Sequence, residues 1–100
     1  MAKIFELRPI IGKEIPMRSD MKYGEIYFSP QYATVGFLCP CGCGQEVSLP
    51  TKSELWSDIK DAPIWDCTFE NGELTLSPSV LNRVGCKSHF FVRKNKIIWC

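Results

Sequence analysis

Residues 65–76 read Trp-Asp-Cys-Thr-Phe-Glu-Asn-Gly-Glu-Leu-Thr-Leu, and this stretch decides the fold class. Two runs in which apolar and polar residues alternate flank the dipeptide Asn71-Gly72. A two-residue hairpin turn needs positive φ at both central positions, and Asn-Gly satisfies that need best. The stretch therefore predicts an antiparallel β-hairpin.

Strand patterns continue on both sides of this hairpin. A second hairpin is predicted where Phe90-Phe91-Val92 and Ile97-Ile98-Trp99 flank the polar turn 93–96. Alternation or short runs of aromatic and β-branched residues are typical of half-buried strands. Such patterns also occur at 5–8, 25–29, 34–38 and 46–49.

Helical signals are few. One short helix is predicted from Thr51 to about Lys60, because Thr51 and Glu54 form a capping box. The segment 77–79, Ser-Pro-Ser, is predicted to begin a single helical turn, with the proline in its first position. The predicted class is mainly β, a small α+β fold of antiparallel hairpins with one short helix.

Length and composition narrow the classes of protein. We expect one domain over residues 1–100, because typical domains have roughly 100–200 residues. The net charge of +1 gives no global reason to expect nucleic acid or an acidic membrane as a partner. The chain has no signal-peptide pattern and no apolar run of about 18 residues, so we expect a cytoplasmic protein without a membrane partner.

Cysteine and histidine cluster at two places in the sequence. Cys39, Cys41 and Cys43 alternate with proline and glycine in one turn, and Cys86 precedes His89 by three positions. Thiols stay reduced in the cytosol, so clustered cysteines there indicate metal binding before disulfides. Three sulfurs and one nitrogen satisfy tetrahedral zinc. The sequence thus predicts a zinc ion that cross-braces two distant parts of the chain.

The ligand set stays open at this point, because five candidates compete for four positions. Which of the three turn cysteines bind is not determined by spacing. An iron–sulfur cluster held by three cysteines and the histidine, or a redox function, is the alternative to zinc. Cys67 shares a strand face with Trp65 and Phe69 and is predicted to be a core residue, and we expect Cys100 to be a core or surface thiol.

Catalysis has little support in these patterns. A catalytic zinc keeps an open position, and five candidate ligands leave little room for water. The only histidine, His89, is better used as a ligand than as a base for Cys43 or Cys86. The five candidate ligands for four positions therefore argue against an enzyme but do not exclude one.

The C-terminal hairpin carries the basic residues Arg93, Lys94 and Lys96 beside aromatic residues. Such a tip can contact phosphates and stack bases, so nucleic-acid binding through these three residues is one hypothesis. The simpler interpretation is a solvated hairpin end balanced by the acidic stretch before it. A protein partner is also able to use this dipolar surface.

Gly24 to Trp99 resembles a family of small bacterial and phage proteins that is described only as a domain of unknown function. The matching residues are Leu-Cys-Pro-Cys-Gly-Cys-Gly at 38–44, Ser-Pro-Ser at 77–79 and the Cys-x-Ser-His segment at 86–89. The resemblance implies metal binding by the turn cysteines with Cys86 and His89. Family members often carry a histidine where this chain has Phe37, so position 37 supplies no ligand here, which favours Cys86 and His89 with the turn cysteines as the complete set.

Some members of that family are encoded beside genes of bacterial ubiquitin-like conjugation, which implies a role in or near such a pathway. The first functional hypothesis is therefore a non-catalytic, zinc-stabilised module that binds a protein partner, as an accessory factor of a ubiquitin-like conjugation or phage-defence system. A nucleic-acid-binding zinc protein and an iron–sulfur or redox protein are the alternatives.

Overall fold

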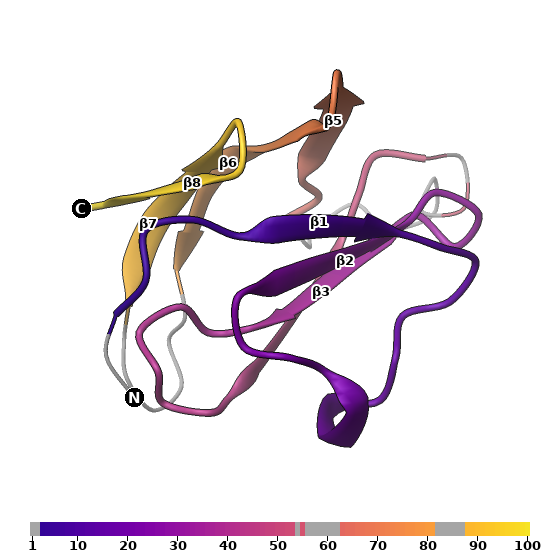
Figure 1. Ribbon diagram of the computed structural model, residues 1–100. Coiled ribbons are helices and arrows are strands. Elements are labelled where there is room, and N and C mark those ends of the chain that lie inside the picture. The colour runs from indigo at the N-terminus through magenta and orange to yellow at the C-terminus, as the bar shows by residue number, and fades with distance from the viewer. Residues whose placement is uncertain (1–2, 54, 56–62, 82–87) are drawn as a thin grey trace.

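Two four-stranded β-sheets make up the fold in a computed structural model that describes residues 3–53, 55, 63–81 and 88–100 (Figure 1). The predicted mainly β class is confirmed. One sheet has the strand order β1-β2-β3-β4 and the other the order β5-β6-β7-β8. The chain thus completes the first sheet before it begins the second.

The first sheet consists of β1 (Arg8–Ile11), β2 (Glu25–Ser29), β3 (Thr34–Leu38) and β4 (Glu46–Pro50). β1 runs parallel to β2, whereas β2, β3 and β4 are antiparallel neighbours. The strands β2, β3 and β4 lie where the sequence patterns predict them. The N-terminal strand begins later than predicted, at Arg8 instead of Phe5, because it pairs with β2 only from that residue on.

The second sheet is an antiparallel meander of β5 (Asp66–Glu70), β6 (Glu73–Leu81), β7 (His89–Arg93) and β8 (Lys96–Trp99). Both predicted hairpins are confirmed. The turn residues Asn71 and Gly72 have φ of 54° and 78°, and Lys94 and Asn95 have φ of 50° and 71°. Positive φ at two successive positions is the geometry that a tight hairpin requires.

Strand β6 contains the Ser-Pro-Ser segment, so the predicted helical turn at 77–79 is wrong. From Leu76 to Val80 the strand β6 advances four residues, while its partner β7 advances two, from Val92 to Phe90. Pro78 has no backbone N–H to give to a ladder, and proline within a sheet is found at edges or bulges. The Ser-Pro-Ser segment, which predicts a helix start from the sequence, therefore forms a β-bulge in this structure.

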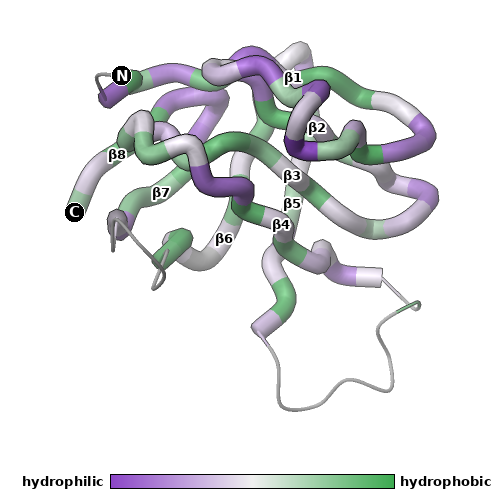
Figure 2. Tube along the Cα trace, turned by 90° about the horizontal axis from the view of Figure 1, so that it is seen from below, coloured by the Kyte–Doolittle hydropathy of each residue, from purple (hydrophilic) through white to green (hydrophobic). Residues whose placement is uncertain are grey.

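The hydrophobic core lies between the two sheets. Phe37 of β3 and Phe90 of β7 are both fully buried, and their rings meet edge to face with centroids 6.2 Å apart. Burial alternates along β4, β7 and β8, which places one face of these strands in the core, whereas β2 and β3 are buried along most of their length (Figure 2). The core also includes Leu7, Ile26, Val35, Cys39, Val47, Leu49, Leu74, Leu76, Val80, Val92 and Ile97.

The N-terminal segment ties the sheets together before it enters the first one. Glu6 forms an isolated antiparallel bridge with Lys96 of β8, and the amide of Leu7 donates to the carbonyl of Asn95 at 2.7 Å. The amide of Ile97 donates in turn to the carbonyl of Phe5 at 2.8 Å. The edge of β8 is thereby covered along part of its length, which protects it from pairing with other chains.

The connection from β1 to β2 covers the outer face of the first sheet. A Cβ atom at Gly36 would meet Ile15 Cγ2 at 2.9 Å and Met21 Cε at 3.2 Å, so only glycine lets this connection pack so closely. The connection contains the 3₁₀-helix η1 (Arg18–Asp20). The outer face of the second sheet, by contrast, carries the exposed side chains of Leu81 and Ile98.

The predicted helix from Thr51 to Lys60 falls mostly on residues 54 and 56–62, which lie outside the described residues. Its expected cap, Thr51, is buried and forms an isolated parallel bridge with Trp65. The amide of Thr51 donates to the carbonyl of Ala33 at 2.8 Å, so the backbone of this residue continues the hydrogen bonding of the first sheet. Within the described residues, no helix is long and apolar enough to span a bilayer.

Cys67 packs against the core, as predicted from its strand face. Burial, and secondarily the adjacent Asp66 carboxylate, raise the pKa of its thiol to about 12. The thiolate is the species that alkylating agents attack. We therefore expect Cys67 to react with iodoacetamide at pH 8 roughly a hundred times more slowly than the exposed Cys100, measured by mass spectrometry of tryptic peptides. Similar rates at the two positions would contradict this environment.

Candidate functional site

The three turn cysteines lie together at the end of β3. Cys39 is fully buried, Cys41 is half-buried and Cys43 is exposed, so the turn leads from the core to the surface. The amide of Cys39 donates to the carbonyl of Gln45 at 2.8 Å, which closes the loop. Gly42 and Gly44 have φ of 89° and 82°. The predicted need for glycine in this turn is confirmed, because side chains rarely adopt such φ values.

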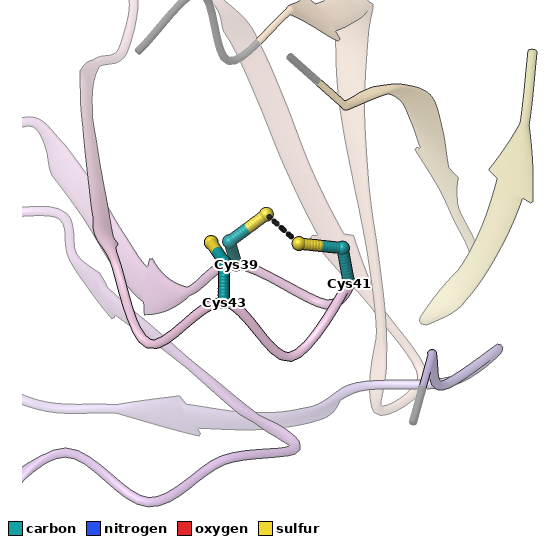
Figure 3. Close-up of side chains that lie close together, drawn as sticks. All are labelled: Cys39, Cys41 and Cys43. Carbon is teal, nitrogen blue, oxygen red and sulfur yellow. Dashed lines mark hydrogen bonds between the residues drawn. The ribbon is translucent and has the colours of Figure 1, made fainter. Parts of the chain in front are cut away.

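The sulfur atoms of Cys39, Cys41 and Cys43 converge on one volume. All three lie within 4.8 Å of one another, and the Sγ atoms of Cys39 and Cys41 are 3.4 Å apart (Figure 3). Zinc–sulfur bonds of about 2.3 Å in a tetrahedron separate the sulfurs by roughly 3.8 Å. Small side-chain rotations would therefore be enough to place all three sulfurs around one metal ion. The three cysteines form a candidate metal centre, and its donor chemistry suits a soft, thiophilic ion.

Two hydrogen bonds hold this turn at Pro40. The hydroxyl of Tyr23 donates to the carbonyl oxygen of Pro40 at 2.7 Å, and the amide of Ile4 donates to the same oxygen at 3.0 Å. Burial raises the pKa of Tyr23, and negative charge on Cys41, Cys39 and Cys43 raises it further. The phenol therefore stays protonated and remains a donor near the sulfurs. Pro40 itself is fully buried, so the turn is anchored on both sides.

The other two predicted ligands have different positions. Cys86 lies outside the described residues. His89 is the first residue of β7, and it does not belong to the group that the three cysteines form. As metal ligands, Cys86 and His89 therefore stay predictions.

His89 instead faces a serine on the neighbouring strand. Its Nε2 atom lies 2.7 Å from the Oγ atom of Ser79, a hydrogen-bond distance. Leu81 of β6 is directly opposite His89, which makes Ser79 a diagonal neighbour of His89 on the same sheet face. A hydroxyl within hydrogen-bond reach of an imidazole is the arrangement of an activated nucleophile and its base. Within the described residues, His89 has no carboxylate partner.

The surroundings of this pair are partly apolar. The His89 ring lies 6.4 Å from that of Phe91, and the Arg93 guanidinium lies 4.5 Å from the centre of the Phe91 ring. Ile98 is directly opposite Phe91 and is exposed, as is Leu81. The outer face of the second sheet thus presents Ser79 and His89 next to a shallow apolar surface.

The three basic residues proposed for nucleic acid lie at the β7–β8 turn, and all are exposed. Arg93 and Lys96 are directly opposite each other. Lys94 lines a hollow that also contains Glu70 and Glu73 of the β5–β6 hairpin. These acidic neighbours agree with the simpler interpretation of a charge-balanced hairpin end, and nucleic-acid binding stays a prediction.

Sequence reasoning missed Ser79 as a functional residue. The sequence patterns offer only cysteines as nucleophiles and predict a helix start at the Ser-Pro-Ser segment. The available signal was a proline inside a segment of strand-forming residues, which indicates a bulge. A bulge in β6 brings Ser79 close to His89 on the adjacent strand β7, but the sequence does not reveal the register of that bulge.

The fold and these side chains define a small two-sheet β protein with a candidate metal centre and a serine–histidine pair on an open sheet face. The chain belongs to the family described as "Bacterial ubiquitination-like system serine protease (BubE)", which matches residues 12–100. The expected link with bacterial ubiquitin-like systems is thereby confirmed. No curated protein and no solved structure shows a significant match to the chain.

The hydrogen bond from Tyr23 to the cysteine turn can be tested through metal affinity. We expect Tyr23→Phe to weaken zinc binding about fivefold, because a net hydrogen bond contributes about 1 kcal/mol. Competition with a chromophoric chelator measures this affinity. The matched control is Tyr32→Phe, which removes a hydroxyl from an exposed side chain. Equal affinities for both variants would contradict a role of Tyr23 in holding the turn.

Proposed function

We propose that this protein is a serine-type peptidase of a bacterial ubiquitination-like system, with Ser79 as nucleophile, His89 as general base and a structural zinc ion at the cysteine turn. The observation that carries the proposal is the 2.7 Å distance between Ser79 Oγ and His89 Nε2. The family description supports it, since it names a serine protease. The expectation of a non-catalytic module gives way to this proposal.

The chemistry follows from the pair. Neutral His89 accepts the hydroxyl proton of Ser79 at Nε2 while Oγ attacks the carbonyl carbon of a peptide bond. His89 then returns that proton to the leaving amine, and the acyl group remains on Ser79. A water molecule, deprotonated by the same nitrogen, hydrolyses the acyl-enzyme and restores the serine hydroxyl.

Among the described residues the pair has no carboxylate partner, and a serine–histidine pair of this kind is a minimal form of the catalyst. The carboxylate of a triad holds the imidazole in one tautomer and orientation. Here the His89 side chain is instead flanked by Phe91 on its own strand, and the His89 carbonyl accepts the amide of Cys100 at 3.0 Å. These contacts support a fixed position of the backbone that carries the base.

The metal has a structural role in this proposal. Thiolate-rich zinc sites are typically closed and stabilise the fold, whereas catalytic zinc keeps a water position. The cysteine turn joins the end of β3 to β4, and Cys39 is part of the core. We keep Cys86 as the predicted fourth ligand, which leaves His89 available to Ser79.

Covalent labelling with a fluorophosphonate tests the catalytic proposal without a known substrate. Ser79 Oγ forms the bond to phosphorus, fluoride leaves and the proton passes to His89. We expect one adduct on Ser79, no labelling of Ser79→Ala and a rate at least about a hundredfold lower for His89→Ala. The rate should also fall as the pH is lowered, because a protonated imidazole cannot accept the proton.

Ser77→Ala is the matched control, since Ser77 is an exposed serine on the same strand and in the same Ser-Pro-Ser segment. It should label at the wild-type rate. If the folded, zinc-loaded wild-type protein is not labelled, the peptidase proposal is contradicted. The non-catalytic interaction module would then be the favoured hypothesis. Labelling of Ser77 in place of Ser79 would equally contradict the assigned roles.

Metal analysis tests the second half of the proposal. We expect about one zinc per chain, lost in Cys39→Ser together with much of the thermal stability, because structural zinc contributes about 10–16 kcal/mol of apparent binding free energy in zinc-finger peptides. His89→Ala should keep its zinc. Visible absorption with bound iron would favour the iron–sulfur alternative, and loss of zinc from His89→Ala would make that histidine a ligand.

A further inference from the structure

The backbone that carries Ser79 is irregular, and one side chain from outside the strand is bonded to it. Regular pairing of β6 with β7 breaks between Leu76 and Val80, so Ser79 lies inside the bulge. The indole Nε1–H of Trp65 donates a hydrogen bond to the carbonyl oxygen of Ser79 at 3.3 Å. The carbonyl of Ser79 thus accepts a hydrogen bond from a side chain. In a regular strand, a backbone N–H of the adjacent strand would donate this bond.

Trp65 is itself fixed firmly enough to act as such a support. Its side chain is half-buried and packs against the core. Its amide donates to the carbonyl of Pro50 at 2.9 Å, and its carbonyl accepts the amide of Lys52 at 2.8 Å. These bonds form the parallel bridge between Trp65 and Thr51. Thr51 directly follows Pro50, the last residue of β4. Trp65 therefore connects the bulge in the second sheet with the first sheet.

A bulged segment has fewer ladder hydrogen bonds to fix its backbone than a regular strand has. Its extra residues are not paired in the ladder, and Pro78 supplies no N–H. The distance between Ser79 Oγ and His89 Nε2 depends on the position of Ser79 along this segment. A displacement of about 1 Å in a reacting group costs up to roughly a hundredfold in rate.

We propose that Trp65 is a positioning residue for Ser79, whose indole N–H fixes the bulged backbone so that the serine hydroxyl stays within hydrogen-bond reach of His89. The inference rests on the proposed peptidase function and adds a residue that acts on the nucleophile through its carbonyl group. The hydrogen bond of Trp65 is to the carbonyl oxygen of Ser79 and not to its hydroxyl. Its contribution is to the geometry of the pair.

The chain contains a matched control for this proposal. Trp99 is also half-buried, also packs against the core and also donates from Nε1 to a backbone carbonyl at 3.3 Å, that of Ile4. Trp65→Phe and Trp99→Phe therefore remove the same type of hydrogen bond from similarly buried indoles. Only the first variant releases the carbonyl of Ser79.

The experiment measures fluorophosphonate inactivation of the zinc-loaded full chain over a range of probe concentrations and pH. For Trp65→Phe we expect the maximal rate constant of inactivation to fall roughly tenfold. The probe concentration at half-maximal rate and the pH midpoint should stay near wild type, because neither the probe surface nor His89 changes. Trp99→Phe should keep the wild-type rate constant, and thermal unfolding of both variants should be compared.

A rate constant for Trp65→Phe equal to that of Trp99→Phe would overturn the proposal. Equal losses in both variants, in proportion to their loss of thermal stability, would assign Trp65 a general packing role and would overturn it too. If Trp65→Phe does not fold, benzothienylalanine at position 65 keeps the shape of the indole and lacks the N–H. Absence of labelling in the wild type would refute the peptidase itself, so the two failures are distinguishable.

Discussion

The edge-to-face contact between Phe37 and Phe90 is the interaction on which the arrangement of both candidate sites depends. It joins β3 of the first sheet to β7 of the second inside the core. Side chains alternate along a strand, so with Phe90 facing the core its neighbour His89 faces the open surface. Cys39, two residues after Phe37, stays on the core side at the start of the cysteine turn. A register slip of one residue in β7 would bury the imidazole and remove it from Ser79.

This arrangement separates two kinds of chemistry in one short chain. The cysteine turn is anchored in the interior through Cys39 and Pro40, and its hydrogen bonds from Tyr23 and Ile4 tie it to the N-terminal part of the protein. The serine–histidine pair lies on the outer face of the second sheet. A small domain buries little surface, so a metal is an economical source of stability. Under the proposed function, the stability that a metal ion would supply leaves the outer face of the second sheet open for a substrate.

Much of the fold was predictable from local signals, and the reason is physical. Asn71-Gly72 requires a tight hairpin whatever surrounds it, and the strands 25–29 and 34–38 are short runs of aromatic and β-branched residues, which suit buried strands. The candidate metal site was equally predictable, because cysteines that alternate with proline and glycine in one turn have few other uses. In each case a few neighbouring residues determine the structure.

The serine–histidine pair was not predictable in this way, because it depends on non-local register. Ser79 and His89 meet only if β6 contains a bulge and β7 pairs with it diagonally, and a Ser-Pro pair favours a helix start just as well. The single histidine also had a stronger apparent use as a zinc ligand beside Cys86. One Nε2 atom cannot both bind a metal ion and accept the Ser79 proton. The central claim about this protein is therefore that the turn cysteines bind the metal ion, whereas His89 accepts the proton of Ser79.

A crystal structure of the zinc-loaded protein, with diffraction data collected at the zinc edge, tests that claim most directly. The account predicts one anomalous peak bound by sulfurs of the turn that contains Cys39, Cys41 and Cys43, and a separate hydrogen bond between Ser79 Oγ and His89 Nε2. A peak with an imidazole nitrogen of His89 among its ligands, and Ser79 turned away from it, would contradict the account.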